Sequence, residues 1–207
     1  MTPIINDVAI QYLCEIDPIF DNIIEKYGLP PNWSRPQGFE TLVRIILEQQ
    51  VSLESANAAY RKLKGDASDL TPQYILNFSD FELRACYISR QKSVYLRELS
   101  KAVLNNALDF DLLHQLSTEE VKSVLTAIKG IGHWTAEVYL IMCLQAPDLF
   151  PLGDIAALNT VKELKLVDTK EAVASIVEKW QPYRTTALFL MWHYYLKKRN
   201  RSFESIL

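Results

Sequence analysis

The sequence is poor in the features that build disulfide frameworks, metal clusters and membrane spans. Its 207 residues include only three cysteines, and Cys14, Cys86 and Cys143 are far apart with no CxxC pair. Unaided, they cannot supply a zinc or iron–sulfur ligand set, and they do not suggest a disulfide framework. No apolar run approaches the ~20 residues that a membrane-spanning helix needs. We therefore expect no membrane association.

An excess of positive charge is also missing. The chain has 22 lysines and arginines against 25 aspartates and glutamates, a formal net charge of −3. Dedicated nucleic-acid binders are often basic, so this balance weighs against DNA, although a local basic patch can hide within it. The first residues, MTPIINDVAIQYLCEIDP, carry acids and no basic region, unlike a secretory signal. We expect an intracellular protein, cytoplasmic in a bacterium or nuclear in a eukaryote.

Strand patterns are scarce, and the chain reads as almost entirely helical. There is no sustained period-two alternation and no Asn-Gly hairpin. The segment FETLVRIILEQQVSLESANAAYRKLKG predicts two helices with a break near residues 50–52. In STEEVKSVLTAIKG, Ser117 and Glu120 have capping-box spacing, and Gly130 is a good residue for a helix end. The predicted fold class is all-α.

Glycine is rare as well, yet two of the six glycines flank Ile131 in the stretch IKGIGHWTAEVYLIM, residues 128–142. A helix, a short turn and a second helix predict a helix–hairpin–helix unit over about 118–145. Glycines allow a turn with positive φ and a close approach by another backbone. The amides at the start of the second helix attract anions such as phosphate, and Lys129 and His133 could add contacts. An ordinary helical hairpin is the alternative.

Four stretches in this order carry a family resemblance. They are FETLVRIILEQQVSLESA, LRACYISRQKSVYLRELSKAV, LTAIKGIGHWTAEVYLIM with DLFPLGDIAALNTVKEL, and WQPYRTTALFLMW. Together, over residues 36 to 196, they resemble the helix–hairpin–helix superfamily of DNA glycosylases. Within it, the chain looks most like the bacterial and yeast 3-methyladenine DNA glycosylases.

The resemblance implies an all-α protein of two lobes with a DNA-binding cleft. Residues 36–149 would form the lobe with the hairpin, and residues 1–35 with 150–207 the second lobe. The implied function is hydrolysis of the N-glycosidic bond to alkylated purines of the 3-methyladenine and 7-methylguanine type. The base would be flipped out of the duplex during base excision repair. The implied partner is double-stranded DNA with a damaged base, bound by a monomer, and the chemistry requires no cofactor.

The resemblance assigns the catalytic role to Asp154 in FPLGD, where the family carries its single essential aspartate. A compatible reading from the residues alone is that Asp154 caps a helix beginning at Ile155, because aspartate is a favoured N-cap residue.

Two tryptophans are implied to contact the base. Trp134 stands where relatives that also cut DNA carry a lysine that forms a Schiff base, so the resemblance implies base removal without strand cleavage. An aromatic face could line the pocket and meet a cationic base, and Trp192 matches a second pocket aromatic. Either tryptophan could instead belong to the core, Trp134 on a stripe with Val138 and Met142. Some relatives carry a tyrosine at the position of Val138 and an aromatic residue at that of Ile155, which leaves the base spectrum open.

Further residues are implied to meet the DNA backbone or the gap left by the flipped base. Gln50, beside Gln49, best matches the family's wedge, although an exposed turn explains these glutamines equally well. The hairpin contacts are Lys129, Gly130, Gly132, His133 and Thr135. Backbone carbonyls of Thr126, Ile128 and Ile131 match a site for a monovalent cation, sodium or potassium. The basic residues Arg84, Arg90, Lys92, Arg97 and Lys101 could face DNA or simply solvent.

Three other functions stay open at this point. One is a related glycosylase for hypoxanthine or a cyclic etheno adduct, and a second is a DNA-damage binder without catalysis. The third is a helical scaffold with no role on DNA, which the negative net charge favours. Asp154 favours an enzyme over a binder.

Overall fold

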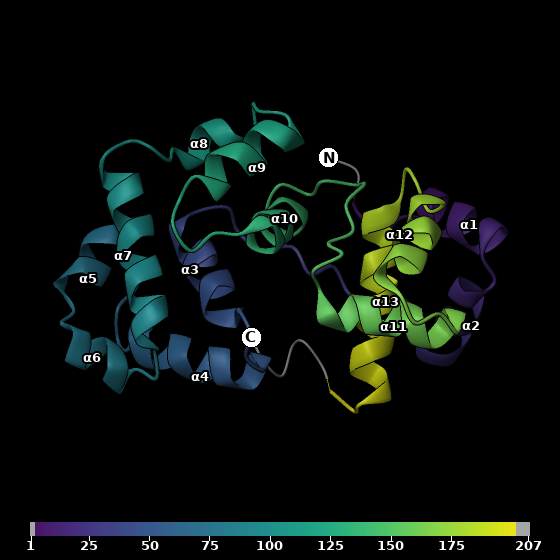
Figure 1. The fold of residues 1–207 in the computed structure, drawn as a ribbon, viewed down its shortest axis with the longest axis horizontal. Helices are drawn as coiled ribbons and strands as arrows, with labels where there is room; N and C mark the ends of the chain where they lie inside the picture. The colour runs from purple at the N-terminus through teal and green to yellow at the C-terminus, as the bar shows by residue number, and fades with distance from the viewer. Residues whose placement is uncertain (1–2, 202–207) are drawn as a thin grey trace. The chain divides into compact units, whose positions relative to one another are not determined.

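The computed structural model describes residues 3–201, and every regular element in that range is an α-helix (Figure 1). The prediction of an all-α fold is confirmed. The helices are α1 (Asp7–Ile16), α2 (Ile19–Tyr27), α3 (Phe39–Glu48), α4 (Leu53–Lys64), α5 (Pro72–Asn77), α6 (Asp80–Ala85), α7 (Arg90–Leu104), α8 (Phe110–Leu113), α9 (Thr118–Thr126), α10 (His133–Met142), α11 (Ile155–Lys165), α12 (Lys170–Glu178) and α13 (Arg184–Lys198). Across these residues, no helix has the length and apolar character needed to cross a membrane.

The chain divides into two compact units. Among the described residues, the middle unit is Arg35–Leu144, and the terminal unit combines residues 3–34 with residues 145–201. The sequence placed the second boundary at 149/150, whereas the contacts place it at 144/145. The reason is that residues 146–149 are hydrogen-bonded to the start of α13, within the terminal unit.

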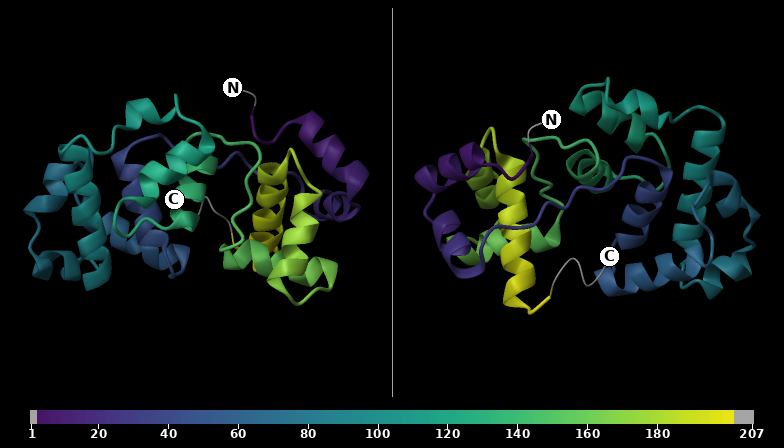
Figure 2. Two further views of the ribbon diagram at one scale, coloured as in Figure 1. Left: turned by 45° about the horizontal axis from the view of Figure 1, so that its top comes forward. Right: turned by 180° about the vertical axis from the view of Figure 1, so that it is seen from behind.

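The middle unit is organised around α3, which contacts α4, α7 and α10. Because neighbours surround it, α3 is apolar on several faces, and Leu42, Val43, Ile45 and Ile46 are fully buried. The long helix α7 lies along α3 and α5 in both views of Figure 2. The predicted break between α3 and α4 occurs at residues 49–52, where Ser52 caps α4 by accepting from the amide of Ser55.

The terminal unit is organised around α13, which contacts α1, α2 and α11. Its residues from Thr185 to Met191 are all buried. The carboxylate of Asp17, between α1 and α2, accepts from Lys165 Nζ at 2.6 Å and from Trp180 Nε1 at 3.2 Å. These bonds join the N-terminal helices to the C-terminal ones, so the unit is assembled from both ends of the chain.

Candidate functional site

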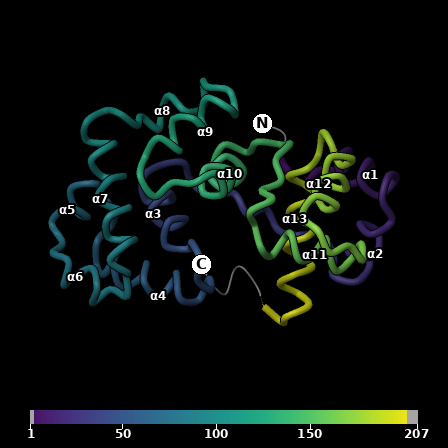
Figure 3. Tube along the Cα trace, in the orientation of Figure 1, coloured from purple at the N-terminus to yellow at the C-terminus, as the bar shows by residue number. Residues whose placement is uncertain are grey.

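The predicted hairpin is formed by α9 and α10 in the middle unit, joined by a tight turn that Figure 3 traces. The capping box at the start of α9 is present, with the Ser117 amide donating to Glu120 Oε2 at 2.8 Å. Within the turn, the amide of Ile131 donates to the carbonyl oxygen of Ile128 at 3.0 Å. The second helix begins after Gly132, which provides no capping side chain. The start of α10 therefore presents backbone amides and the positive end of a helix dipole.

The two glycines of the turn have different roles. Gly130 has φ of +98°, and a Cβ added there would lie 2.1 Å from Cγ of Tyr95 on α7. Gly132 has φ of −90°, which any residue adopts, and a Cβ there would meet open space. The expectation that both glycines serve a positive φ is wrong for Gly132. Gly130 is required by the backbone and by contact with α7, whereas neither the backbone nor a neighbour requires glycine at position 132.

The remaining hairpin side chains differ in exposure. Lys129 and His133 are exposed, and Trp134 is partly buried on the first turn of α10. Thr135 is buried, and its Oγ1 accepts from Gln49 Nε2 at 2.9 Å, so its side chain faces the interior of the middle unit. The hydrogen bond from Lys101 lowers the pKa of the Glu98 carboxyl, and the charge of Lys129 lowers it further.

Gln49 follows α3 and is tied to the hairpin. Its Nε2 donates to the carbonyl oxygen of Gly130 and to Oγ1 of Thr135, both at 2.9 Å. The sequence predicted a DNA contact for Gln49; in the structure its amide group is engaged inside the middle unit. Gln49 thus connects the α3–α4 turn to the hairpin.

The two residues before Gln49 are also anchored. The carbonyl oxygen of Leu47 accepts from Lys92 Nζ of α7 at 2.6 Å. Glu48 and Arg35 form a bidentate ion pair at 2.8 and 3.1 Å, with both side chains largely buried. Three consecutive residues are therefore held by three different parts of the unit.

The tip of the α3–α4 turn follows directly. Gln50 is exposed with φ of +56°, and the side chain of Val51 is 46% exposed. A non-glycine residue with positive φ is uncommon and is often found where the surrounding structure imposes it. The three anchored residues before it supply that constraint, and the result is a short protruding tip on a fixed base.

Asp154 lies in the terminal unit and is the N-cap residue of α11. Its Oδ1 accepts from the amide of Ala157 at 2.9 Å, and its own amide donates to the carbonyl oxygen of Pro151 at 2.9 Å. Only 8% of the residue is exposed. The capping interpretation is confirmed, and the same contacts hold the carboxylate in one orientation.

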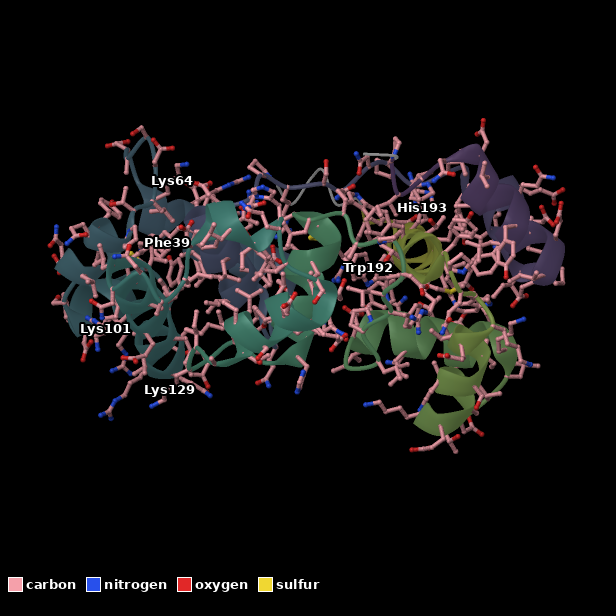
Figure 4. All side chains as sticks on the ribbon, turned by 90° about the horizontal axis from the view of Figure 1, so that it is seen from above. Phe39, Lys64, Lys101, Lys129, Trp192 and His193 are labelled. Atoms are coloured by element: carbon pink, nitrogen blue, oxygen red, sulfur yellow. The ribbon has the colours of Figure 1, made fainter. Side chains whose placement is uncertain are left out.

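Aromatic side chains cluster on α13 in the same unit. Trp192 is partly exposed, and its ring stacks on Phe189 with centroids 5.8 Å apart. Trp33, which is 5% exposed, lies behind both rings, 5.4 Å from Phe189 and 6.2 Å from Trp192. Figure 4 shows Trp192 and His193 on different sides of α13. His193 is buried with its Nε2 3.0 Å from the carbonyl oxygen of Tyr27.

Comparison with known proteins identifies the family. The profile of the HhH-GPD superfamily base excision DNA repair proteins matches residues 43–182. The chain belongs to this superfamily. The DNA-3-methyladenine glycosylase 1 of Schizosaccharomyces pombe is 31% identical over 192 residues, covering 87% of this chain and 84% of that protein.

Two solved structures are similar to this HhH-GPD protein over most of their length. The 3-methyladenine DNA glycosylase of S. pombe, in complex with abasic DNA, has a TM-score of 0.83 at 29% identity, covering 89% of this chain and 94% of that one. The DNA-3-methyladenine glycosidase of Bacillus halodurans has a TM-score of 0.75 at 30% identity, covering 93% of this chain and 91% of that one. The family resemblance read from the sequence is confirmed.

The basic residues of this HhH-GPD protein do not form one exposed stripe. Arg84 and Arg90 are exposed, whereas Lys92 is half-buried against the Leu47 carbonyl and burial lowers its pKa. Arg97 pairs with Asp80 at 2.7 Å, and Lys101 with Glu98 at 2.8 Å. Three of the five candidates therefore have partners within the protein. The partners of Lys92 and Arg97 lie on other helices, where the sequence does not reveal them. Lys101 and Glu98 are three residues apart on α7, a spacing that the sequence already contains.

Several structural roles were missed by the sequence analysis. Trp33 was not singled out, and neither were Arg184 and Thr185, which bind the loop that leads to Asp154. Their partners lie 36 or more positions away along the chain. The only available signal for Arg184 and Thr185 was their place within WQPYRTTALFLMW, one of the stretches that carry the family resemblance.

Proposed function

We propose that this HhH-GPD protein is a DNA glycosylase that hydrolyses the N-glycosidic bond of alkylated purines in double-stranded DNA. The observation that carries the proposal is Asp154, a carboxylate buried at the start of α11 and held there by the amide of Ala157. The similarity to proteins named 3-methyladenine DNA glycosylases, across nearly the whole chain, supports the alkylated purine as the substrate class.

The chemistry needs one carboxylate. Alkylation at ring N3 or N7 makes a purine cationic, which weakens the glycosidic bond and improves the leaving group. As the bond breaks, positive charge develops on the sugar at C1′. Asp154 would stabilise this charge electrostatically and orient or deprotonate the attacking water. The reaction so written uses no organic cofactor.

Access to the base requires that the nucleotide leave the duplex, at a cost of a few kcal/mol. The exposed Gln50 and Val51 are suited to fill the gap, because their turn is fixed by Gln49, Glu48 and Leu47. The amides at the start of α10, with exposed Lys129 and His133, would hold the phosphate backbone without reading sequence. The solved structure of a relative in complex with abasic DNA supports the binding of DNA.

The base would meet an aromatic surface. Trp192, partly exposed over the Phe189 and Trp33 rings, offers its face to a cationic purine. Trp134, on α10 of the middle unit, cannot form a Schiff base, so the product would be an intact abasic site.

A monovalent cation could be bound by the hairpin, through the backbone carbonyl oxygens of Thr126, Ile128 and Ile131. They are neutral oxygen donors of the kind that hard cations prefer, and Thr126 is the last residue of α9. The Ile128 carbonyl accepts one hydrogen bond, from Ile131, and retains a second lone pair. Such an ion would add positive charge beside the phosphate.

A base-release assay tests the proposal. The protein is incubated with DNA methylated by dimethyl sulfate, and with duplexes that contain hypoxanthine or ethenoadenine, and the freed bases are identified by chromatography. We expect release of 3-methyladenine and 7-methylguanine. Release confined to hypoxanthine or ethenoadenine would assign another lesion, and binding to abasic DNA without any release would indicate a binder. A gel-filtration profile with and without duplex would test the expected monomer.

A further inference from the structure

The N-terminus of α13 is capped by a distant loop. Tyr183, its N-cap residue, makes no side-chain capping bond. Instead, the Arg184 amide donates to Asp148 Oδ1 at 3.2 Å, and the Thr185 amide donates to the carbonyl oxygen of Pro147 at 3.1 Å. The first amides of a helix need such acceptors, so the segment 146–149 and α13 are mutually dependent.

The side chains of the same two residues hold the same segment. The Thr185 hydroxyl donates to the carbonyl oxygen of Ala146 at 2.7 Å and accepts from the amide of Leu149 at 3.0 Å. Arg184 forms a bidentate pair with Asp148, with Nε to Oδ1 at 2.8 Å and Nη2 to Oδ2 at 2.9 Å. Bidentate charged pairs are geometrically specific, and Thr185 is fully buried, so these bonds fix a position as well as adding stability.

The restraint continues from this segment to Asp154. Only residues 150–153 separate Leu149 from Asp154. The Phe150 ring is buried against Trp180, with centroids 5.8 Å apart. The Pro151 carbonyl accepts the amide of Asp154 at 2.9 Å. A displacement of Leu149 would therefore shift the Asp154 carboxylate, because the segment of four residues between them is short and restrained.

We propose that Thr185 and the Arg184–Asp148 pair are positioning residues for Asp154. The inference rests on the proposed glycosylase function. The same helix carries Trp192 seven residues beyond Thr185, about two helical turns later. One rigid element thus sets both the loop that ends in the carboxylate and the aromatic face proposed for the base.

The chain contains a matched control in the next residue. Thr186 is also buried on α13, and its hydroxyl donates at 2.7 Å to a backbone carbonyl, that of Ile4. Thr185→Val and Thr186→Val each remove one buried hydroxyl of the same helix, but only Thr185 holds the loop before Asp154. Thr185→Ser keeps the hydroxyl and serves as the rescue variant.

The experiment compares these variants in the full chain. Single-turnover release of 7-methylguanine at saturating enzyme reports the chemical step, and the Kd for abasic-site duplex reports binding. Because a misplacement of about 1 Å can cost ~10²-fold in rate, we expect Thr185→Val to slow release about tenfold. Its Kd should stay within a few-fold, Thr186→Val should release at the parent rate, and Thr185→Ser should recover most of the loss.

Thermal melting of every variant accompanies the rates. Equal release by Thr185→Val and Thr186→Val, with both folded, would overturn the inference. If Thr185→Val does not fold, Asp148→Ala carries the same test, because it removes both carboxylate oxygens that Arg184 contacts and leaves the Thr185 hydroxyl in place. An unchanged release rate in that variant would overturn the inference. A parent protein that releases no alkylated base would overturn the proposed function, and the positioning role with it.

Discussion

The side-chain amide of Gln49 donates a 2.9 Å hydrogen bond to the carbonyl oxygen of Gly130, 81 positions further along the chain. This bond joins the two parts of the middle unit that are proposed to meet DNA, the α3–α4 turn and the hairpin. A shift of either part would strain the bond, so the protruding Gln50 and the amides of α10 are held as one surface within that unit.

Substitution of Gln49, which makes this hydrogen bond, should destabilise the fold more than substitution of the exposed Gln50. Gln49→Leu leaves the Thr135 hydroxyl and the Gly130 carbonyl without this donor, which should lower the free energy of unfolding by about 1–3 kcal/mol. Gln50→Ala alters an exposed side chain and should change stability by less than about 0.5 kcal/mol while slowing base release. Urea unfolding and the release assay on both variants would check this. Equal stability of the two variants would remove the linking role of Gln49.

Substitution of the two hairpin glycines should affect different properties, the stability of the fold at Gly130 and the affinity for DNA at Gly132. Gly130→Ala places a Cβ on a backbone with φ of +98° and against Tyr95, so the free energy of unfolding should fall by more than about 1 kcal/mol. Gly132→Ala meets no neighbour and should melt like the parent. It should nevertheless weaken binding to damaged and undamaged DNA alike, because a phosphate that approaches the amides carries no sequence information. Unchanged affinity in a folded Gly132→Ala protein would remove the phosphate contact.

Asp154 combines a cap and the proposed catalytic carboxylate, and two substitutions separate these roles. Asp154→Asn keeps an oxygen that can accept from Ala157, so the fold and the DNA affinity should persist while base release is lost. Asp154→Ala also loses the cap and should cost about 1 kcal/mol of stability. Melting, abasic-DNA binding and release of 7-methylguanine distinguish the cases. Near-parent release by Asp154→Asn would exclude the catalytic role.

After base release, the sugar–phosphate backbone of the product DNA should remain uncut. Trp134 offers no amine to attack the sugar, so release should leave abasic sites that break only after alkali or heat. Denaturing gels before and after alkali would show this, and borohydride should trap no protein–DNA adduct. A trapped adduct would mean that another residue supplies a lyase amine.

His193 should make stability depend on pH. Burial lowers its pKa below the ordinary 6.5, while the hydrogen bond to the Tyr27 carbonyl works in the other direction. The unfolded chain therefore binds the proton more readily. The free energy of unfolding should fall as the pH drops below about 6.5, and this contribution should end below the folded-state pKa. Carboxyls whose pKa is lowered on folding, such as that of Glu40, reduce the free energy of unfolding only as the pH falls below their ordinary pKa of 4.5, which lies below the range of the measurement. Urea unfolding between pH 7.5 and 5.5 should show a smaller decline in His193→Gln; equal slopes would contradict this.

Local chemistry made part of this structure predictable. The Ser117–Glu120 capping box, the break after Glu48 and the cap at Asp154 depend on residues within a few positions of one another. The role of Gln49 depends on the hairpin, and the sequence holds no local mark of that contact. Likewise, a G-x-G pattern cannot say which glycine takes the positive φ, or that Tyr95 of another helix lies against Gly130.

The discontinuous terminal unit has a consequence for the order of folding during synthesis. Tyr12 bonds to the Gln181 carbonyl and Thr186 to the Ile4 carbonyl, across 169 and 182 positions. Helices α1 and α2 leave the ribosome before α13 and must wait for it to form these contacts, while Arg35–Leu144 can close its own contacts earlier. During that interval, Leu13 of α1 and Phe20 of α2, both buried in the folded protein, lack the residues that cover them. A chaperone that binds exposed apolar side chains would bind the nascent chain at this stage.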